Sequence, residues 1–242
     1  MKNQKDTVYS QPLEKIGEFR FDGQVADVFE NMIQRSVPGY SLLLEMIGVL
    51  TNRYAQPATN CYDLGCSLGA STLKIRQNLP ADCTVIGIDN SEAMVSRCRH
   101  NMQRDHSQAI ATIRLENIED SAIENASVVV MNFTLQFIAD DKRADILKRI
   151  AKGLRPGGIL ILAEKIHFEN ASRQQLMTDL HNDFKTYQGY SDLEIAQKRT
   201  SLENVLVPNS IDQHIARLKA AGFSTTELCV RCLNFAAFLA IK

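Results

Sequence analysis

Residues 61–72, Cys-Tyr-Asp-Leu-Gly-Cys-Ser-Leu-Gly-Ala-Ser-Thr, join the end of an apolar strand to the start of a helix through two glycines. Twenty residues after Gly69, a second apolar strand, Thr84–Ile88, ends at Asp89. A glycine-bearing strand-to-helix turn followed by an acid at the tip of the next strand is the arrangement that holds adenosine-containing ligands. The segment therefore predicts an α/β protein with a nucleoside site at one edge of its sheet.

The alternation of strand-like and helix-like segments continues to the C-terminus. We expect helices over 69–78, 91–104, 140–153 and 211–220, and a turn at 155–158. We expect strands over 60–64, 84–88, 110–115, 127–133, 159–164, 223–230 and 234–241. This order predicts a Rossmann-like fold, with a seven-stranded, mostly parallel sheet and helices on both faces.

Two helical segments are added to this pattern. Residues 1–57 have apolar side chains at helical spacing and predict an N-terminal helical extension. Residues 166–209 predict a helical insertion before the last helix, with one helix opened by Ser172 and another by the capping box Ser191-x-x-Glu194. We expect residues 1–242 to form a single domain.

Composition narrows the class of protein. The 242 residues carry a formal net charge of −1, which does not favour direct nucleic-acid binding. The longest apolar stretch, Leu42–Leu50, is short and contains Glu45, so no membrane span is predicted. The N-terminus lacks the apolar region of a signal peptide, and we expect a cytoplasmic protein with reduced cysteines. No metal site is expected, because the Cys229-x-x-Cys232 pair has no complementary ligands.

The spacing of the glycine motif distinguishes between two kinds of adenosine ligand. A dinucleotide site favours G-x-G-x-x-G, whereas this chain has Asp63 two residues before Gly65, then Ser67 and Gly69. The Asp63 carboxylate would repel a pyrophosphate but suits a ligand with an ammonium group. Asp89 can accept hydrogen bonds from both ribose hydroxyls. The motif resembles that of class I S-adenosylmethionine-dependent methyltransferases, with Ser67 in place of the usual middle glycine.

Further segments of the chain have a distinctive sequence, and they are Val37–Tyr40, Asp63–Gly69, Asn132–Phe137, Gly189–Ser191, Gln197–Arg199 and Leu202–Val205. These segments resemble one family, the carboxy-S-adenosylmethionine synthases that serve wobble-uridine modification of bacterial tRNA. The resemblance covers nearly the whole chain, and the segment that begins at Asn132 and the insertion around Arg199 are its most specific parts.

This resemblance implies an unusual reaction. The methyl carbon of S-adenosylmethionine gains a carboxyl group from prephenate, which becomes phenylpyruvate. The resemblance also implies a homodimer whose insertion reaches the partner's site. The product, carboxy-S-adenosylmethionine, would pass to a separate tRNA-modifying enzyme. Carboxy-S-adenosylmethionine or S-adenosylhomocysteine could copurify with the protein.

The resemblance also implies roles for individual residues. Arg199 would hold the carboxylate beside the sulfonium through two parallel hydrogen bonds, and Tyr40 would approach the methionine end of the cofactor. Asn132 lies where open α/β sheets place their ligands. The expected ligand-binding set is Tyr40, Asp63, Gly65, Cys66, Ser67, Gly69, Asp89, Asn90, Asn117, Ile118, Asn132 and Arg199. The histidines His167, His181 and His214 are interpreted as surface or packing residues.

Three alternatives stay open at this point. The chain could be a conventional methyltransferase of small molecules, although it has no recognisable nucleophile-activating base. It could be a non-catalytic S-adenosylmethionine-binding partner of a tRNA-modifying enzyme. A dinucleotide-dependent oxidoreductase is a more distant alternative.

Overall fold

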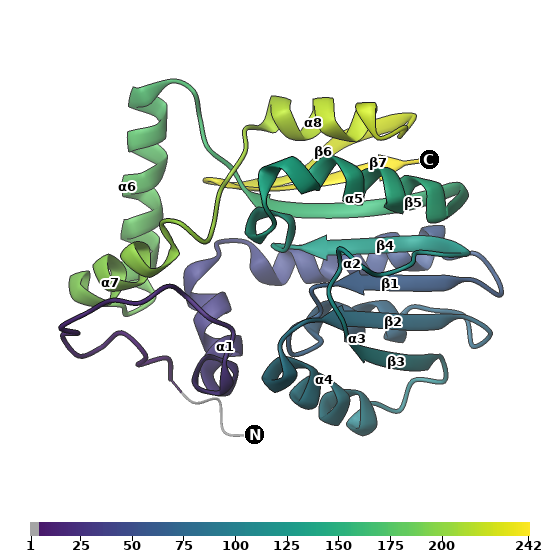
Figure 1. Ribbon diagram of the computed structural model, residues 1–242, viewed down its shortest axis with the longest axis horizontal. Helices are drawn as coiled ribbons and strands as arrows, with labels where there is room; N and C mark the ends of the chain where they lie inside the picture. Colours follow the sequence, from purple (N-terminus) through teal and green to yellow (C-terminus); the bar gives the residue numbers. More distant parts are fainter. Residues whose placement is uncertain (1–4) are drawn as a thin grey trace.

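A computed structural model describes residues 5–242, so the first four residues of the predicted N-terminal extension lie outside the described part. Seven strands form one sheet in the order β3-β2-β1-β4-β5-β7-β6 (Figure 1). Pairing is parallel from β3 to β5, and β7 is antiparallel to both of its neighbours. The predicted mostly parallel sheet is confirmed. The strands are β1 Asn60–Leu64, β2 Thr84–Asp89, β3 Ile110–Leu115, β4 Ala126–Asn132, β5 Leu154–Lys165, β6 Thr225–Cys232 and β7 Phe235–Ile241.

Helices cover both faces of the sheet, and the apolar side chains on the two faces form separate clusters. The helices α2 (Tyr40–Tyr54), α3 (Ala70–Gln77) and α4 (Glu92–Arg104) pack on one face. The helices α5 (Asp140–Gly153) and α8 (Ile211–Ala220) pack on the other. The central strand β4 is buried along almost its whole length, as expected for a parallel strand covered on both faces.

The N-terminal extension is only partly helical, and this corrects the sequence prediction. Helix α1 spans Gly23–Ser36, but residues 5–22 contain no long helix. This segment is held instead by the buried side chain of Gln197. Its amide nitrogen donates to the carbonyl oxygens of Tyr9 and Gln11, and its amide oxygen accepts from the backbone nitrogen of Leu13. Such long-range bonds leave no periodic signal in the sequence.

The insertion forms α6 (Ala171–Tyr187) and α7 (Asp192–Leu202). The predicted capping box of Ser191 and Glu194 is confirmed. The prediction that Ser172 opens α6 is wrong, because the N-cap is Asn170, whose side chain accepts from the backbone nitrogen of Arg173. Figure 1 shows α1, α6 and α7 beyond the carboxyl ends of the parallel strands.

The predicted turn at 155–158 is part of β5. Leu154 already pairs with Ala126, and pairing resumes between Ile159 and Val128. Four residues of β5 therefore lie opposite a single residue of β4, which is the geometry of an extended β-bulge. The strand consequently begins earlier than its apolar run indicates.

The position of Gly65, in the turn between β1 and α3, requires a glycine for two reasons: its backbone conformation is left-handed, and there is no room for a side chain. Its φ is +84°, and a Cβ atom there would lie 2.3 Å from Oγ1 of Thr134. We expect Gly65→Ala to lower the free energy of unfolding by about 2–4 kcal/mol, from left-handed strain and overpacking. Thermal unfolding would measure this loss. Gly23→Ala is the matched control, because a Cβ at Gly23 meets nothing within 4 Å. An unchanged melting temperature for Gly65→Ala would contradict the assignment.

Candidate functional site

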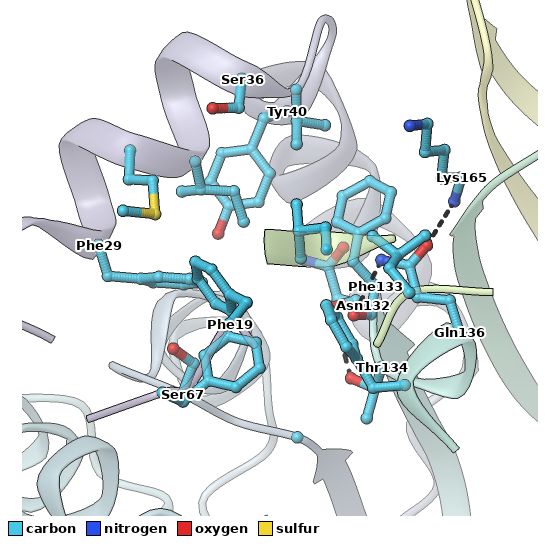
Figure 2. Close-up of a pocket in the computed structure, with 18 of the residues that line it drawn as sticks. Phe19, Phe29, Ser36, Tyr40, Ser67, Asn132, Phe133, Thr134, Gln136 and Lys165 are labelled. Carbon is cyan, nitrogen blue, oxygen red and sulfur yellow. Dashed lines mark hydrogen bonds between the residues drawn. The ribbon is translucent and has the colours of Figure 1, made fainter. Parts of the chain in front are cut away.

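A cavity of about 760 Å³ lies over the carboxyl ends of the parallel strands, within the size range of small-molecule sites. Figure 2 shows its central part, where Phe19 and Phe29 lie across from Asn132 and Phe133. Its walls come from the N-terminal segment, the start of α2, the glycine turn, the segment after β4, and the insertion. Segments far apart in the sequence thus meet around one cavity.

Asp89 is held rigidly at the tip of β2. Its two carboxylate oxygens accept from the backbone nitrogens of Ser67 and Ser91, each at 2.9 Å. Burial raises the pKa of Asp89 above its ordinary value, although these backbone hydrogen bonds oppose the shift. An ionised carboxylate retains further lone pairs after these two bonds, so it can still accept from ribose hydroxyls. Asp89 therefore fits its predicted role.

Asn90, Asn117 and Ile118 line the cavity next to Asp89. The side-chain nitrogen of Asn90 donates to the side-chain oxygen of Asn117 at 3.1 Å. An amide oxygen has two lone pairs, so Asn117 can also accept from an adenine amine. The three residues thus lie together in one part of the cavity wall.

The glycine turn separates two kinds of position. Gly65, Cys66 and Ser67 line the cavity, whereas Gly69 lies behind its wall. A Cβ at Gly69 would lie 2.7 Å from the Cys98 sulfur, so this glycine lets α3 approach α4. Ser67 has a φ of +49°, the left-handed region that a glycine would occupy more easily. This conformation explains why the middle position of the motif is usually glycine.

Asp63, on β1 two residues before Gly65, is fully buried and is not one of the residues that line the cavity. One carboxylate oxygen accepts from the Thr72 hydroxyl at 2.6 Å, and the other has no partner among residues 5–242. The side-chain oxygen of Asn132 on β4 is likewise buried without a partner in the described chain, while its nitrogen donates to Ser71. Two orphaned acceptors at the ends of adjacent strands fit a ligand that brings a donor such as an ammonium group.

The pKa of Asp63 makes it possible to test, by varying the pH, whether Asp63 binds a cationic ligand. Burial raises that pKa to about 7, so the free protein carries a mostly protonated Asp63 below this pH. A cationic ligand favours the ionised form, and its binding must then release a proton. We expect the Kd of S-adenosylhomocysteine to rise roughly fivefold as the pH falls from about 7 to about 6. Calorimetry on wild type and Asp63→Asn would measure this Kd at both pH values. An equal pH dependence of the Kd in the two proteins would contradict the assignment of Asp63 to the ammonium group.

The segment after β4 is held in an unusual conformation. Phe133 has a φ of +60°, which is rare for a bulky residue and is often found at functional sites. The fully buried Glu164 accepts from the backbone nitrogens of Leu135 and Gln136, each at 2.9 Å, and so fixes the short helix η1 (Leu135–Phe137). Burial raises the pKa of Glu164 to about 8. The sequence reasoning missed Glu164, because it resembles an ordinary acid at a strand end.

Tyr40 begins α2 directly after Gly39, which has a φ of +82°. The side chain is 7% exposed, and Figure 2 shows its hydroxyl directed toward the middle of the cavity. Burial raises the pKa of Tyr40 far above its usual range, so the hydroxyl stays protonated and can donate a hydrogen bond.

Arg199 lies on α7, is exposed, and lines the cavity. Within residues 5–242 no carboxylate lies within salt-bridge distance of it. Its neighbour Lys198, by contrast, already has partners. The Lys198 ammonium donates to the Ser36 hydroxyl at 3.0 Å and lies 4.0 Å from the Asp6 carboxylate. The guanidinium of Arg199 is therefore available to an anionic group.

The cavity also contains residues that the sequence reasoning missed. Phe19, Phe21 and Phe29 supply an aromatic wall, but their spacing looks like ordinary core packing. Lys165 and Lys185 also line the cavity, and as single lysines they carry no motif. For His181 the sequence predicts a surface or packing role. It is a buried packing residue whose Nε2 lies 2.8 Å from the Ser36 carbonyl oxygen, and burial lowers its pKa to about 3.

Comparison with known proteins identifies the family. A methyltransferase-domain family matches residues 62–158. A carboxy-S-adenosyl-L-methionine synthase from Hahella chejuensis is 55% identical over the full length of both chains. One from Aliivibrio fischeri is 52% identical over 98% of each. The chain belongs to the carboxy-S-adenosyl-L-methionine synthase family. The resemblance seen in the sequence is thereby confirmed.

Solved structures agree on the fold. Human N-acetylserotonin methyltransferase, in complex with SAM, superimposes with a TM-score of 0.62 at 18% identity, covering 100% of this chain and 63% of that one. An O-methyltransferase family protein from Burkholderia thailandensis gives 0.65 at 15% identity, covering 91% and 60%. The described helices include none that is both long and apolar enough to span a bilayer.

Proposed function

We propose that this member of the carboxy-S-adenosyl-L-methionine synthase family converts S-adenosyl-L-methionine and prephenate into carboxy-S-adenosyl-L-methionine and phenylpyruvate. The observation that carries the proposal is full-length identity of 50–55% to proteins of that name. The cavity supports it, because a site suited to a cationic nucleoside continues into a region of unpaired positive charge. A simple methyl transfer would not need that second region.

The site residues have four different roles in this proposal. Asp89, Asn90, Asn117, Ile118 and the turn Gly65–Ser67 hold the adenosine. Asp63 and Asn132 supply acceptors for the ammonium group of the methionine part, and the Tyr40 hydroxyl donates near them. Arg199 holds the carboxyl group that is transferred. Gly69 contributes by positioning α3 against α4.

The atom balance defines what the site must accommodate. A carbon–carbon bond breaks between the prephenate ring and its carboxyl group, and one forms between that carboxyl carbon and the methyl carbon of S-adenosylmethionine. The ring loses hydroxide as it becomes aromatic, and the methyl carbon loses a proton, so one water is released. The protein's part is orientation and charge stabilisation.

We further propose a cytoplasmic homodimer that passes its product to a separate tRNA-modifying enzyme. Support for the dimer comes from exposed apolar side chains on the insertion, since Tyr187 is 88% exposed and Leu176 and Leu180 are also exposed. Exposed apolar side chains that gather on one helix are a common feature of protein interfaces.

The test is a product analysis. Purified protein is incubated with S-adenosylmethionine and prephenate, and the products are separated and weighed by mass spectrometry. We expect a nucleoside heavier than the substrate by one carboxyl group, together with phenylpyruvate. Unmodified S-adenosylmethionine and no phenylpyruvate would refute the proposal. S-adenosylhomocysteine formed with an added acceptor would favour a conventional methyltransferase.

A further inference from the structure

Lys165 and Lys185 are two cations of the cavity that the adenosine and methionine contacts leave unused. Lys165 ends β5, two residues after Ala163, which pairs with Asn132 of β4. Lys185 lies in the last turn of α6. Both side chains are half-buried and line the cavity, and Figure 2 shows Lys165 beside Phe133 and Gln136. The insertion and the sheet thus bring two ammonium groups to one region.

Neither lysine has a counterion among residues 5–242. In the part of the chain that the structure describes, no salt bridge involves Lys165 or Lys185, whereas Lys74, Lys142 and Lys148 each pair with a carboxylate. Burial, followed by repulsion from Lys165 and Arg199, lowers the pKa of Lys185 to about 8. Like charges held together away from water raise the free energy of the unbound site. An anion placed between them would relieve that cost.

Apolar rings lie next to this charge. Lys165 pairs with Phe235 across the β5–β7 ladder, and the Phe235 ring lies 5.6 Å from that of Phe133. Both phenylalanines line the cavity. The region therefore suits a small ring that carries a carboxylate, such as prephenate or phenylpyruvate.

Arg199 comes from a different element of the cavity wall than the two lysines. It lies one turn before Leu202, which packs in the cluster that contains Leu68 of the glycine turn and Met94 of α4. Lys165, by contrast, lies at β5, beyond β4 in the strand order. The guanidinium and the pair of ammonium groups are thus suited to two different carboxylates.

We propose that Lys165 and Lys185 form a subsite for the carboxylate that prephenate retains, on its pyruvyl side chain, while Arg199 holds the carboxylate that is transferred. This inference rests on the proposed function, because it assigns the second substrate of that reaction. The two lysines act as positioning residues that anchor the ring while its other end reacts. Ammonium groups suit this role, since they bind an anion as point charges.

Kinetics of Lys165→Met and Lys185→Met test the subsite. Methionine keeps an unbranched side chain of similar length and removes the charge. We expect the KM for prephenate to rise about 10- to 100-fold in each variant, from the loss of a charged hydrogen bond. The Kd of S-adenosylhomocysteine should stay within about twofold, and Lys→Arg variants should recover most of the affinity. Lys148→Met, at an exposed lysine on α5, is the matched control.

Inhibition by phenylpyruvate identifies the carboxylate concerned, because this product keeps only the pyruvyl carboxylate. The subsite predicts that its Ki rises in parallel with the KM for prephenate. A raised KM with an unchanged Ki would overturn the assignment, as would a wild-type KM in both methionine variants. A reduced kcat with an unchanged KM would also overturn it. A wild-type protein that makes no carboxy-S-adenosylmethionine would refute the proposed function itself, and the subsite with it.

Discussion

Replacing Arg199 by Gln is expected to lower kcat/KM for carboxy-S-adenosylmethionine formation by about 100- to 1,000-fold. Removing one charged donor that faces developing or transferred negative charge has effects of this size in other enzymes. Arg199 has no carboxylate partner in residues 5–242 and lines the cavity, so its charge is available to the substrate. Initial rates of phenylpyruvate release, with the nucleoside product quantified by mass, would measure the loss.

Binding measurements separate this role from a structural one. Arg199→Gln should bind S-adenosylhomocysteine almost as well as wild type, but it should lose most of the extra affinity for carboxy-S-adenosylmethionine. Arg199→Lys keeps the charge but cannot form two parallel hydrogen bonds. Its affinity for carboxy-S-adenosylmethionine should therefore lie between those of wild type and Arg199→Gln. Arg104→Gln, at the exposed end of α4, is the control. Full activity in Arg199→Gln would mean that another group holds the transferred carboxylate.

Asp89→Ala should weaken S-adenosylmethionine binding by about 100-fold or more. The substitution removes an acceptor for two ribose hydroxyls, each worth about 1.5–3 kcal/mol when the acceptor is charged. It also leaves the backbone nitrogens of Ser67 and Ser91 without their acceptor, so the glycine turn loses its support. Isothermal calorimetry would give the Kd directly.

The conservative variant and a surface control make this result specific. Asp89→Asn keeps one acceptor oxygen and should weaken binding by only about tenfold. Asp212→Ala, at an exposed acid in the first turn of α8, should bind like wild type. A Kd for Asp89→Ala within threefold of wild type, about 0.7 kcal/mol, would show that the ribose lies elsewhere.

The parts of the fold that local patterns specify could be predicted. The apolar runs of β1, β2 and β4 are each buried by their neighbours, so their periodicity reports their position directly. The glycine turn and Asp89 could be placed because a tight turn at a strand tip requires those residue types. Tyr40, Asn132 and Arg199 needed the family resemblance as well, since each would otherwise fit an ordinary helix or strand end.

The remaining features depend on contacts between distant segments. Glu164 becomes a support for η1 only when β5 lies beside β4. Gln197 holds residues 9–13 from more than 180 positions away. Lys165 and Lys185 gain significance only because the insertion folds over the sheet edge. No short-range sequence pattern encodes these contacts between distant segments. They could therefore be identified only from the three-dimensional structure.

Isotope tracing can show whether this cavity joins the methyl carbon of S-adenosylmethionine to the ring carboxyl group of a second substrate. Prephenate labelled with ¹³C in its ring carboxyl group is incubated with the protein and unlabelled S-adenosylmethionine, with unlabelled bicarbonate in excess. We expect the label to appear in the new carboxyl group of the nucleoside product. Label that is found only in released carbon dioxide, with an unlabelled nucleoside, would contradict it.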